Sequence, residues 1–147
     1  MRLTRFTDYS LRVLIYLGQN TQDRVTIHQI SEAYDISKNH LMKVVSNLTR
    51  LRIVVAQRGP GGGIQLNRAP EDINLREVVR NTERHLHQVD VYDPQETTEL
   101  SPETRLNNYL HHALLAYLET LGNYTLSDIL QPVVEIEHLM DLNENTV

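Results

Sequence analysis

The sequence predicts a mainly α-helical protein with a small β-hairpin: a winged helix-turn-helix domain followed by a long dimerisation helix. Three observations lead to this fold class. Two short helices are joined by a three-residue turn over residues 26–51, a glycine-rich hairpin spans residues 52–67, and a long apolar helix begins at residue 101. We therefore expect a winged helix-turn-helix domain at 1–83, a sensor-type loop at 84–100, a dimerisation helix region at 101–130 and an acidic tail at 131–147.

The first three expected helices carry clear end signals. An amphipathic helix is expected over residues 5–17, with Gly18 at its C-cap position. Thr26 and Gln29 form a capping box that opens a second helix reaching residue 34, because each side chain can satisfy a free backbone N–H. The apolar face of this second helix is expected to hold Ile27, Ile30 and Ala33.

A third helix is expected to begin after Ser37, whose hydroxyl makes it a suitable N-cap. Apolar residues then recur at i, i+3, i+4 and i+7, which is the spacing of a helix with one buried face. They are Leu41, Val44, Val45, Leu48 and Leu51. The opposite face is polar, so the pair of helices and its turn predict a helix-turn-helix.

Residues 52–57 and 64–66 are expected to form two strands, because they are β-branched or alternate in polarity. Between them lies a tip that reads Arg58-Gly-Pro-Gly-Gly-Gly63. Glycines there favour either a mobile tip or a close approach of the backbone to a partner. A nucleotide-binding loop is excluded, because it requires a helix after the glycines and the next residues are strand-like.

Downstream, helices are expected over residues 73–83, 101–121 and 123–130. Ser101 and Pro102 are typical of a helix start. The helix that follows has more apolar surface than one edge of a small monomer needs, and we expect it to pack against its copy in a homodimer. The residues expected at that dimer interface are Leu106, Leu110, Leu114, Tyr117 and Leu121.

Composition narrows the possible functions. The 147 residues include no cysteine, which excludes disulfides, thiolate nucleophiles and zinc–thiolate fingers. No apolar run is long enough to cross a membrane and no leader peptide is evident, so a cytoplasmic protein with no membrane partner is expected. No catalytic constellation stands out, and an enzyme is not expected.

Charge divides the chain into two unlike halves. Residues 1–70 hold ten Lys/Arg and four Asp/Glu, a net charge of +6, whereas residues 71–147 hold four Lys/Arg and fifteen Asp/Glu, a net charge of −11. A basic module joined to an acidic one is expected when a nucleic-acid-binding domain is fused to an oligomerisation element.

These observations together predict binding to double-stranded DNA. A recognition helix needs polar side chains on its leading turns, and an arginine at the neck of a wing can enter the minor groove. A two-fold dimer would place two such helices on a pseudo-palindromic operator. The residues expected to contact DNA are Ser37, Lys38, Asn39, His40, Lys43, Arg58, Gly61 and Gly62.

Three motifs carry a family resemblance: the opening Met-Arg-Leu-Thr-Arg-Phe-Thr-Asp-Tyr-Ser-Leu-Arg, the run Ser37-Lys-Asn-His-Leu41, and the wing Arg58-Gly-Pro-Gly-Gly-Gly-Ile64. Together they resemble bacterial winged helix-turn-helix repressors of the iron–sulfur regulator family, in particular its nitric-oxide-sensing members. The resemblance runs from Met1 to about Leu130. It implies a homodimeric stress-response repressor with a long crossing helix.

The chain departs from that family at the sensor. The resemblance implies three cluster-binding cysteines near Asp93, Thr98 and Thr104, and none of these residues is a thiolate. Asp8 matches an acidic residue said to complete the cluster in some relatives. We therefore expect no iron–sulfur cluster and no bound cofactor. No metal site is expected, and the residues that could supply ligands to one are Asp8, His85, His87 and His111.

Two alternatives to a repressor without a sensor remain open at this point. In one, a histidine and carboxylate metal site or a small-molecule site replaces the cluster and senses a signal. In the other, the fold has become a protein-interaction module that no longer binds DNA.

Overall fold

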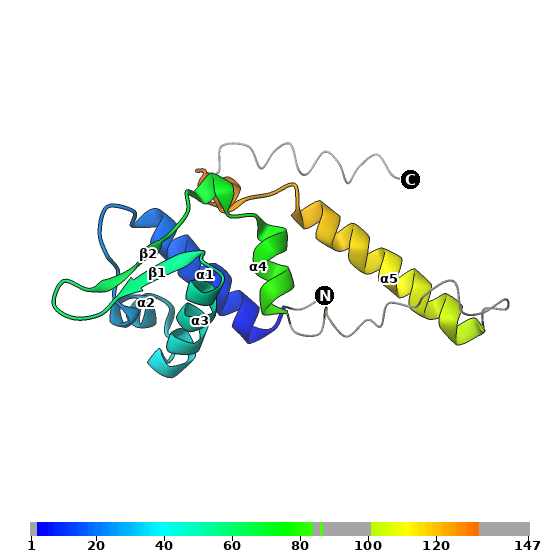
Figure 1. Cartoon of the computed structure of the whole chain (residues 1–147), viewed down its shortest axis with the longest axis horizontal. Coiled ribbons are helices and arrows are strands. Elements are labelled where there is room, and N and C mark those ends of the chain that lie inside the picture. Colours follow the sequence, from blue (N-terminus) through cyan, green and yellow to red (C-terminus); the bar gives the residue numbers. More distant parts are fainter. Residues whose placement is uncertain (1–2, 84–85, 87–100, 133–147) are drawn as a thin grey trace.

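The structure is a computed structural model that describes residues 3–83, 86 and 101–132. Figure 1 shows α1, α2, α3 and the hairpin gathered at one end, α4 beside them, and α5 extending away to the opposite end. In chain order the elements are α1 (Arg5–Gln19), α2 (Ile27–Tyr34), α3 (Lys38–Arg50), β1 (Val54–Gln57), β2 (Gly63–Leu66), the 3-10 turn η1 (Pro70–Asp72), α4 (Leu75–Thr82), α5 (Pro102–Leu121) and α6 (Leu126–Leu130). The predicted mainly helical chain with one hairpin is observed over these residues.

The start of each helix in the helix-turn-helix pair follows from local hydrogen bonding. The Thr26 backbone N–H donates to Gln29 Oε1 at 2.8 Å, and the Gln29 backbone N–H donates to Thr26 Oγ1 at 3.3 Å, so the predicted capping box is formed. Asp35 ends α2 in a left-handed conformation with φ of 52°. Ser37 then caps α3 by accepting the His40 backbone N–H at 3.3 Å. Each cap satisfies a backbone donor that the helix itself leaves free.

The hairpin pairs β1 with β2 in antiparallel register, from Val54 opposite Leu66 to Gln57 opposite Gly63. An isolated bridge adds Val25, whose N–H donates to Ile64 O at 2.9 Å while its carbonyl accepts the Ile64 N–H at 2.7 Å. The segment before α2 is therefore tied to the hairpin. This tie fixes the base of the wing against the helix-turn-helix.

One hydrophobic core holds α1, α2, α3, α4, α6 and the hairpin together. Its buried side chains are Val13, Leu14, Leu17, Val25, Ile30, Ile36, Leu41, Val44, Val45, Leu48, Ile53, Val54, Ile64, Ile73, Val78 and Leu126. Four of these lie on α3 at the predicted helical spacing, and they orient its polar face outward. No residue of α5 is buried.

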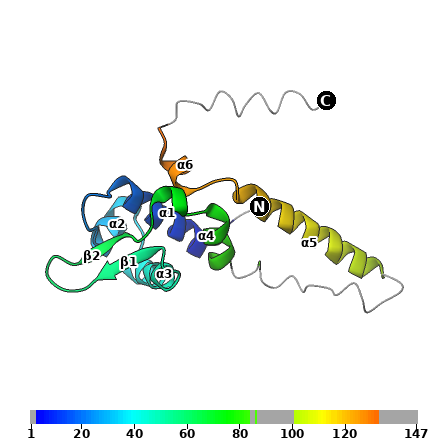
Figure 2. The same cartoon turned by 45° about the horizontal axis from the view of Figure 1, so that its top comes forward.

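The C-terminal end of α5 is attached to α4 by polar contacts. Arg76 donates through Nε to Leu118 O at 2.7 Å and through Nη2 to Glu119 O at 3.2 Å, so a cation lies at the negative end of the α5 dipole. Asn74 Nδ2 donates to Gly122 O at 2.8 Å. A Cβ on Gly122 would overlap the Arg76 guanidinium. Figure 2 shows this end of α5 near α4 while the other end projects outward.

Gly18 does not cap α1, and that prediction is wrong. The helix continues to Gln19, and the Asn20 N–H donates to Leu17 O at 3.2 Å as the C-cap. A Cβ at Gly18 would contact the Leu130 side chain. The glycine therefore makes room for α6 to pack against α1, which is a long-range reason that the local sequence does not reveal.

Three further boundaries and one buried face differ from the sequence predictions. The helix expected from residue 123 begins at Leu126, after the N-cap residue Thr125. The strand expected from residue 52 begins at Val54, because Arg52 adopts a left-handed φ of 57°. The helix expected from residue 73 begins at Leu75, because Ile73 O accepts the Leu126 N–H at 2.8 Å in an extended segment. Ala33 is exposed rather than part of the α2 core face. Within the described residues, no helix is long and apolar enough to cross a membrane.

Candidate nucleic-acid interface

The leading turns of α3 form a continuous polar surface. The core side chains on the other side of the helix force this face into solvent, and all the α3 residues predicted to contact DNA are exposed. They are Ser37 at the N-cap, then Lys38, Asn39, His40 and Lys43. The structure therefore brings the predicted α3 residues together on one element. Further along the same side, Arg50 Nη2 donates to Asn47 Oδ1 at 2.7 Å.

His40 lies at the flank of this surface beside α1. Its ring centroid is 6.0 Å from that of Tyr9, with the two planes tilted by 40°. The centre of the exposed face is occupied by Asn39, Lys43 and Ser46, which are neighbours on the helix at i, i+4 and i+7. Asn39 and Lys43 carry the donors that pair with purine edges in the major groove.

The tip of the hairpin is a tight turn that requires glycine. Gly59 and Gly61 have φ values of 93° and 70°, which residues with a Cβ rarely adopt. The Gly62 N–H donates to Gly59 O at 2.9 Å, and a Cβ on Gly62 would collide with the backbone carbonyls of Gln57 and Gly59. The tip therefore offers bare, exposed backbone next to Arg58, as the sequence predicts for a wing.

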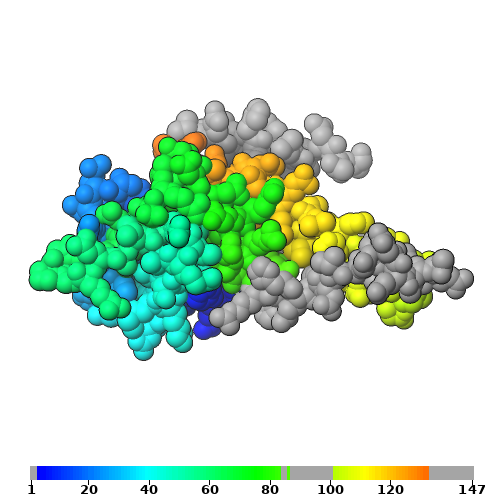
Figure 3. Space-filling model, viewed as in Figure 1, coloured from blue at the N-terminus to red at the C-terminus, as the bar shows by residue number. Residues whose placement is uncertain are grey.

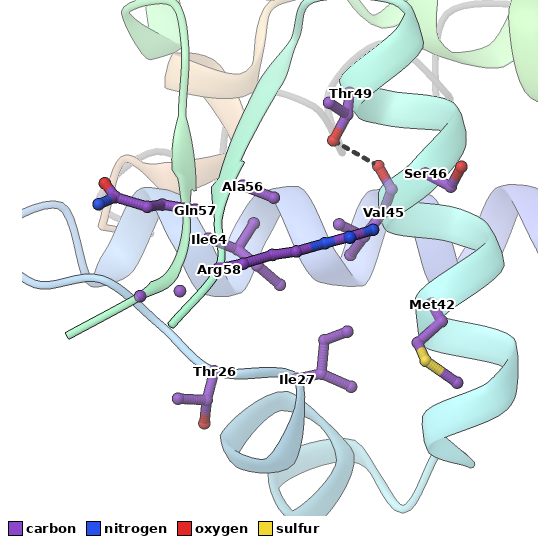
Figure 4. A pocket seen from close by; sticks show the side chains of 12 residues that line it. Thr26, Ile27, Met42, Val45, Ser46, Thr49, Ala56, Gln57, Arg58 and Ile64 are labelled. Carbon is purple, nitrogen blue, oxygen red and sulfur yellow. Dashed lines mark hydrogen bonds between the residues drawn. The ribbon is translucent and has the colours of Figure 1, made fainter. Parts of the chain in front are cut away.

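A hollow of about 670 Å³ separates α3 from the hairpin. Figure 4 shows Arg58 lying across it, with its guanidinium directed toward α3 near Val45. The lining residues come from the start of α2, from α3 and from both strands: Thr26, Ile27, Met42, Val45, Ser46, Thr49, Ala56, Gln57, Arg58, Gly62, Gly63 and Ile64. Figure 3 shows the hairpin at the end of the molecule opposite to α5.

Several residues of this region were not among the predicted DNA contacts, and three of them are Thr26, Met42 and Gln57. Thr26 and Gln57 line the hollow from α2 and β1, and Met42 lies between the hollow and the exposed face of α3. The signal for Met42 was present, because it follows Asn39 by one helical turn on the polar side. Thr26 and Gln57 carry no such local signal, since only the tertiary fold brings them to the hollow.

The predicted dimer-interface residues divide into two groups. Leu106 and Leu110 are each 56% exposed, whereas Leu114, Tyr117 and Leu121 are half-buried. Tyr109, which was not predicted, is 67% exposed on the same helix. Burial raises the pKa of Tyr117, and the negative charge of Glu83 raises it further. We refer to the surface formed by Leu106, Tyr109 and Leu110, the most exposed apolar side chains of α5, as the outward side of α5.

The residues do not fit the iron–sulfur cluster that the family resemblance implies. Such a cluster is held by cysteine thiolates, and the chain has no cysteine. Asp8 Oδ2 accepts Arg12 Nε at 2.9 Å, so its carboxylate is engaged in an ion pair. His111 lies on α5, and His85 and His87 fall outside the described residues. Among the residues that are described, no three His or acidic side chains gather as a metal site.

Sequence comparison places the chain among known regulators. Residues 3–132 match the Rrf2 family model, described as an iron-dependent transcriptional regulator. The HTH-type transcriptional regulator NsrR of Bacillus subtilis is 47% identical over 146 residues, covering 98% of this chain and all of that protein. NsrR of Oceanobacillus iheyensis is 36% identical, covering 98% of this chain and 99% of that protein.

Solved structures agree on the fold. IscR of T. potens superposes with a TM-score of 0.70 at 21% identity, covering 88% of this chain and 86% of that one. CymR, the global cysteine regulator of B. subtilis, superposes with a TM-score of 0.69 at 23% identity, covering 88% and 96%. The predicted winged helix-turn-helix fold class and the predicted family are confirmed. This chain belongs to the Rrf2 family of transcriptional regulators.

Proposed function

We propose that this chain is a sequence-specific DNA-binding repressor that acts as a homodimer on a pseudo-palindromic operator. The observation that supports this most directly is the exposed polar face of α3 beside a glycine-tipped hairpin that carries Arg58. A helix of this kind fits the major groove, and an arginine beside bare backbone fits the narrow, electronegative minor groove. Promoter binding would take place in the cytoplasm.

The spacing between α3 and the hairpin suits a duplex. When a helix enters the major groove and a wing enters the next minor groove, one sugar–phosphate strand must pass between them. The hollow between α3 and β1–β2 is the passage that this arrangement requires, and polar groups from Thr26, Ser46 and Gln57 border it. Arg58 lies across the passage, so binding requires its side chain to move outward.

Each predicted contact has a separate role in this proposal. Lys38 and Lys43 neutralise phosphates or reach guanine, and Asn39 pairs with an adenine edge. Ser37, His40 and the Gly61–Gly62 backbone position the domain on phosphates, and Arg58 enters the minor groove. Dimerisation through the outward side of α5 sets the distance between the two half-sites.

Repression in this proposal does not depend on an iron–sulfur cluster. NsrR of Bacillus subtilis is similar to this chain over 146 residues, but no thiolate is available here to hold a cluster. We therefore expect protein treated with EDTA and assayed without iron to bind its operator as tightly as protein incubated with ferrous iron and sulfide. A large gain on iron reconstitution, together with bound iron by metal analysis, would contradict this part of the proposal.

The central test is selection of a binding site from a pool of random duplexes, followed by affinity measurements at several salt concentrations. We expect a pseudo-palindrome to be enriched, and the logarithm of its binding constant to fall steeply with the logarithm of salt concentration. Arg58→Ala should weaken binding and make that slope shallower, because one positive charge per subunit no longer enters the electronegative minor groove. A pool that remains random after selection would rule out the proposed function.

A matched control separates the effect of losing a contact in the wing from the effect of lowering the net charge of the protein. Arg105 is exposed near the start of α5, far from α3 and the hairpin, and Arg105→Ala removes the same charge as Arg58→Ala. We expect Arg105→Ala to keep nearly the full affinity and salt slope. Equal losses in the two variants would mean that overall charge, and not the wing, determines binding.

A further inference from the structure

Met42 is an apolar side chain in the middle of a polar surface. It is 49% exposed, and it is the only exposed large hydrophobic residue on α2 or α3. The other three residues that line the shallow depression around it are Asn39, Lys43 and Ser46. An exposed methionine at this place is not needed for the core, because α3 already buries Leu41, Val44, Val45 and Leu48.

The position of Met42 is set by two neighbouring surfaces. It lines the outward depression of α3, and it also lines the hollow toward the hairpin, where Ile27 lies across from it (Figure 4). The Met42 side chain therefore borders two parts of α3. One would face base edges, and the other would face the sugar–phosphate backbone of one DNA strand. A flexible, polarisable thioether can adjust to a partner at such a border.

The proposed function limits what that partner can be. Base edges in the major groove present hydrogen-bond donors and acceptors, together with one apolar group, the C5-methyl of thymine. The sugar–phosphate backbone of DNA offers mainly charged phosphates and polar sugars. The apolar contact that best fits Met42 is therefore the thymine methyl.

We propose that Met42 reads a thymine through its C5-methyl, at a base pair next to the one that Asn39 reads. This inference rests on the proposed function, and it adds a specificity residue that neither the sequence motifs nor the polar contacts supply. Asn39 and Met42 are three residues apart on one helix, so they approach adjacent base pairs of the same half-site.

The experiment replaces each thymine of the selected operator in turn with deoxyuridine, which lacks only the methyl group. For the native protein, one symmetric position should weaken binding by about fourfold for each half-site, the value expected for one buried methyl. For Met42→Ala, the thymine and deoxyuridine duplexes should bind equally at that position. Thermal unfolding followed by circular dichroism checks that Met42→Ala folds as the native protein does.

A control variant removes similar apolar area elsewhere. Ile129 on α6 is 41% exposed, and Ile129→Ala should keep the native sensitivity to deoxyuridine. The inference is overturned if Met42→Ala keeps the native difference between the thymine and deoxyuridine duplexes, or if no position is sensitive in the native protein. Those results are distinct from failure of the proposed function, in which no operator is selected at all.

Discussion

The two ends of this molecule place the same kind of sequence pattern in different environments. On α3, apolar residues at helical spacing are buried in the core, and the helix carries the polar face outward. On α5, a helix of 20 residues with a similar apolar pattern has no buried residue, and Leu106, Tyr109 and Leu110 are more than half exposed. A helical apolar stripe therefore indicates a contact surface without indicating whether the same chain or a second one covers it.

The largest expected effect tests whether the apolar side of α3 is buried within one chain. Leu48 on α3 is fully buried, and Leu48→Ala should lower the free energy of unfolding by about 2–5 kcal/mol, through lost apolar contacts and the cavity left behind. Urea unfolding followed by circular dichroism measures this, and the loss should be the same at low and high protein concentration. A loss that depends on concentration would contradict the assignment of Leu48 to the core of one chain.

The second prediction tests whether a second copy of the chain covers the outward side of α5. Leu110→Glu should place a charge on the outward side of α5 and weaken dimerisation by about 2 kcal/mol or more, a typical cost at an interface centre. Sedimentation equilibrium measures the dimer dissociation constant. Leu115→Glu, the same substitution at a residue that is 49% exposed and lies five positions along α5 on another side of the helix, is the control and should leave the constant nearly unchanged. If both variants dimerise like the native chain, the outward side of α5 is not the interface.

Local signals in the sequence accounted for much of the fold. Thr26 and Gln29 formed the predicted capping box, and Ser37 and Ser101 each capped the predicted helix. These predictions succeeded because a cap depends on residues within one turn. The role of Gly18 could not be predicted, because the Leu130 side chain that packs against it is distant in sequence.

The candidate interface could be predicted only in part, because some of its features depend on neighbouring residues and others depend on the tertiary fold. The exposed α3 residues and the wing tip follow from helical spacing and from consecutive glycines. The hollow that joins them depends on the Val25–Ile64 bridge and on the packing of α2 beside α3, which no local pattern encodes. The exposure of Leu106, Tyr109 and Leu110 likewise depends on the tertiary fold, which brings α4 to the opposite, C-terminal end of α5 at Leu118 and Glu119.

A smaller effect is expected where α4 contacts the C-terminal end of α5. Arg76→Ala should remove the two hydrogen bonds to Leu118 and Glu119 and lower the free energy of unfolding by about 1 kcal/mol. Gly122→Ala should cause a similar loss, because its Cβ would displace the Arg76 guanidinium. In the double variant the second change should add almost nothing, since the contact is already lost. Urea unfolding of all four proteins completes the cycle, and additive losses would show that Gly122 acts independently of Arg76.

The smallest expected effect on stability appears only at alkaline pH and concerns Tyr117, a half-buried residue of α5. Burial and the Glu83 charge raise the folded-state pKa of Tyr117 above its unfolded value. The resulting stabilisation is complete below the unfolded tyrosine pKa of about 10 and is lost as the pH rises through the folded value. Tyr117→Phe should therefore show a shallower decline in urea midpoint above pH 10 than the native protein does. Identical curves for Tyr117→Phe and the native protein would mean that neither burial nor the Glu83 charge raises the pKa of Tyr117.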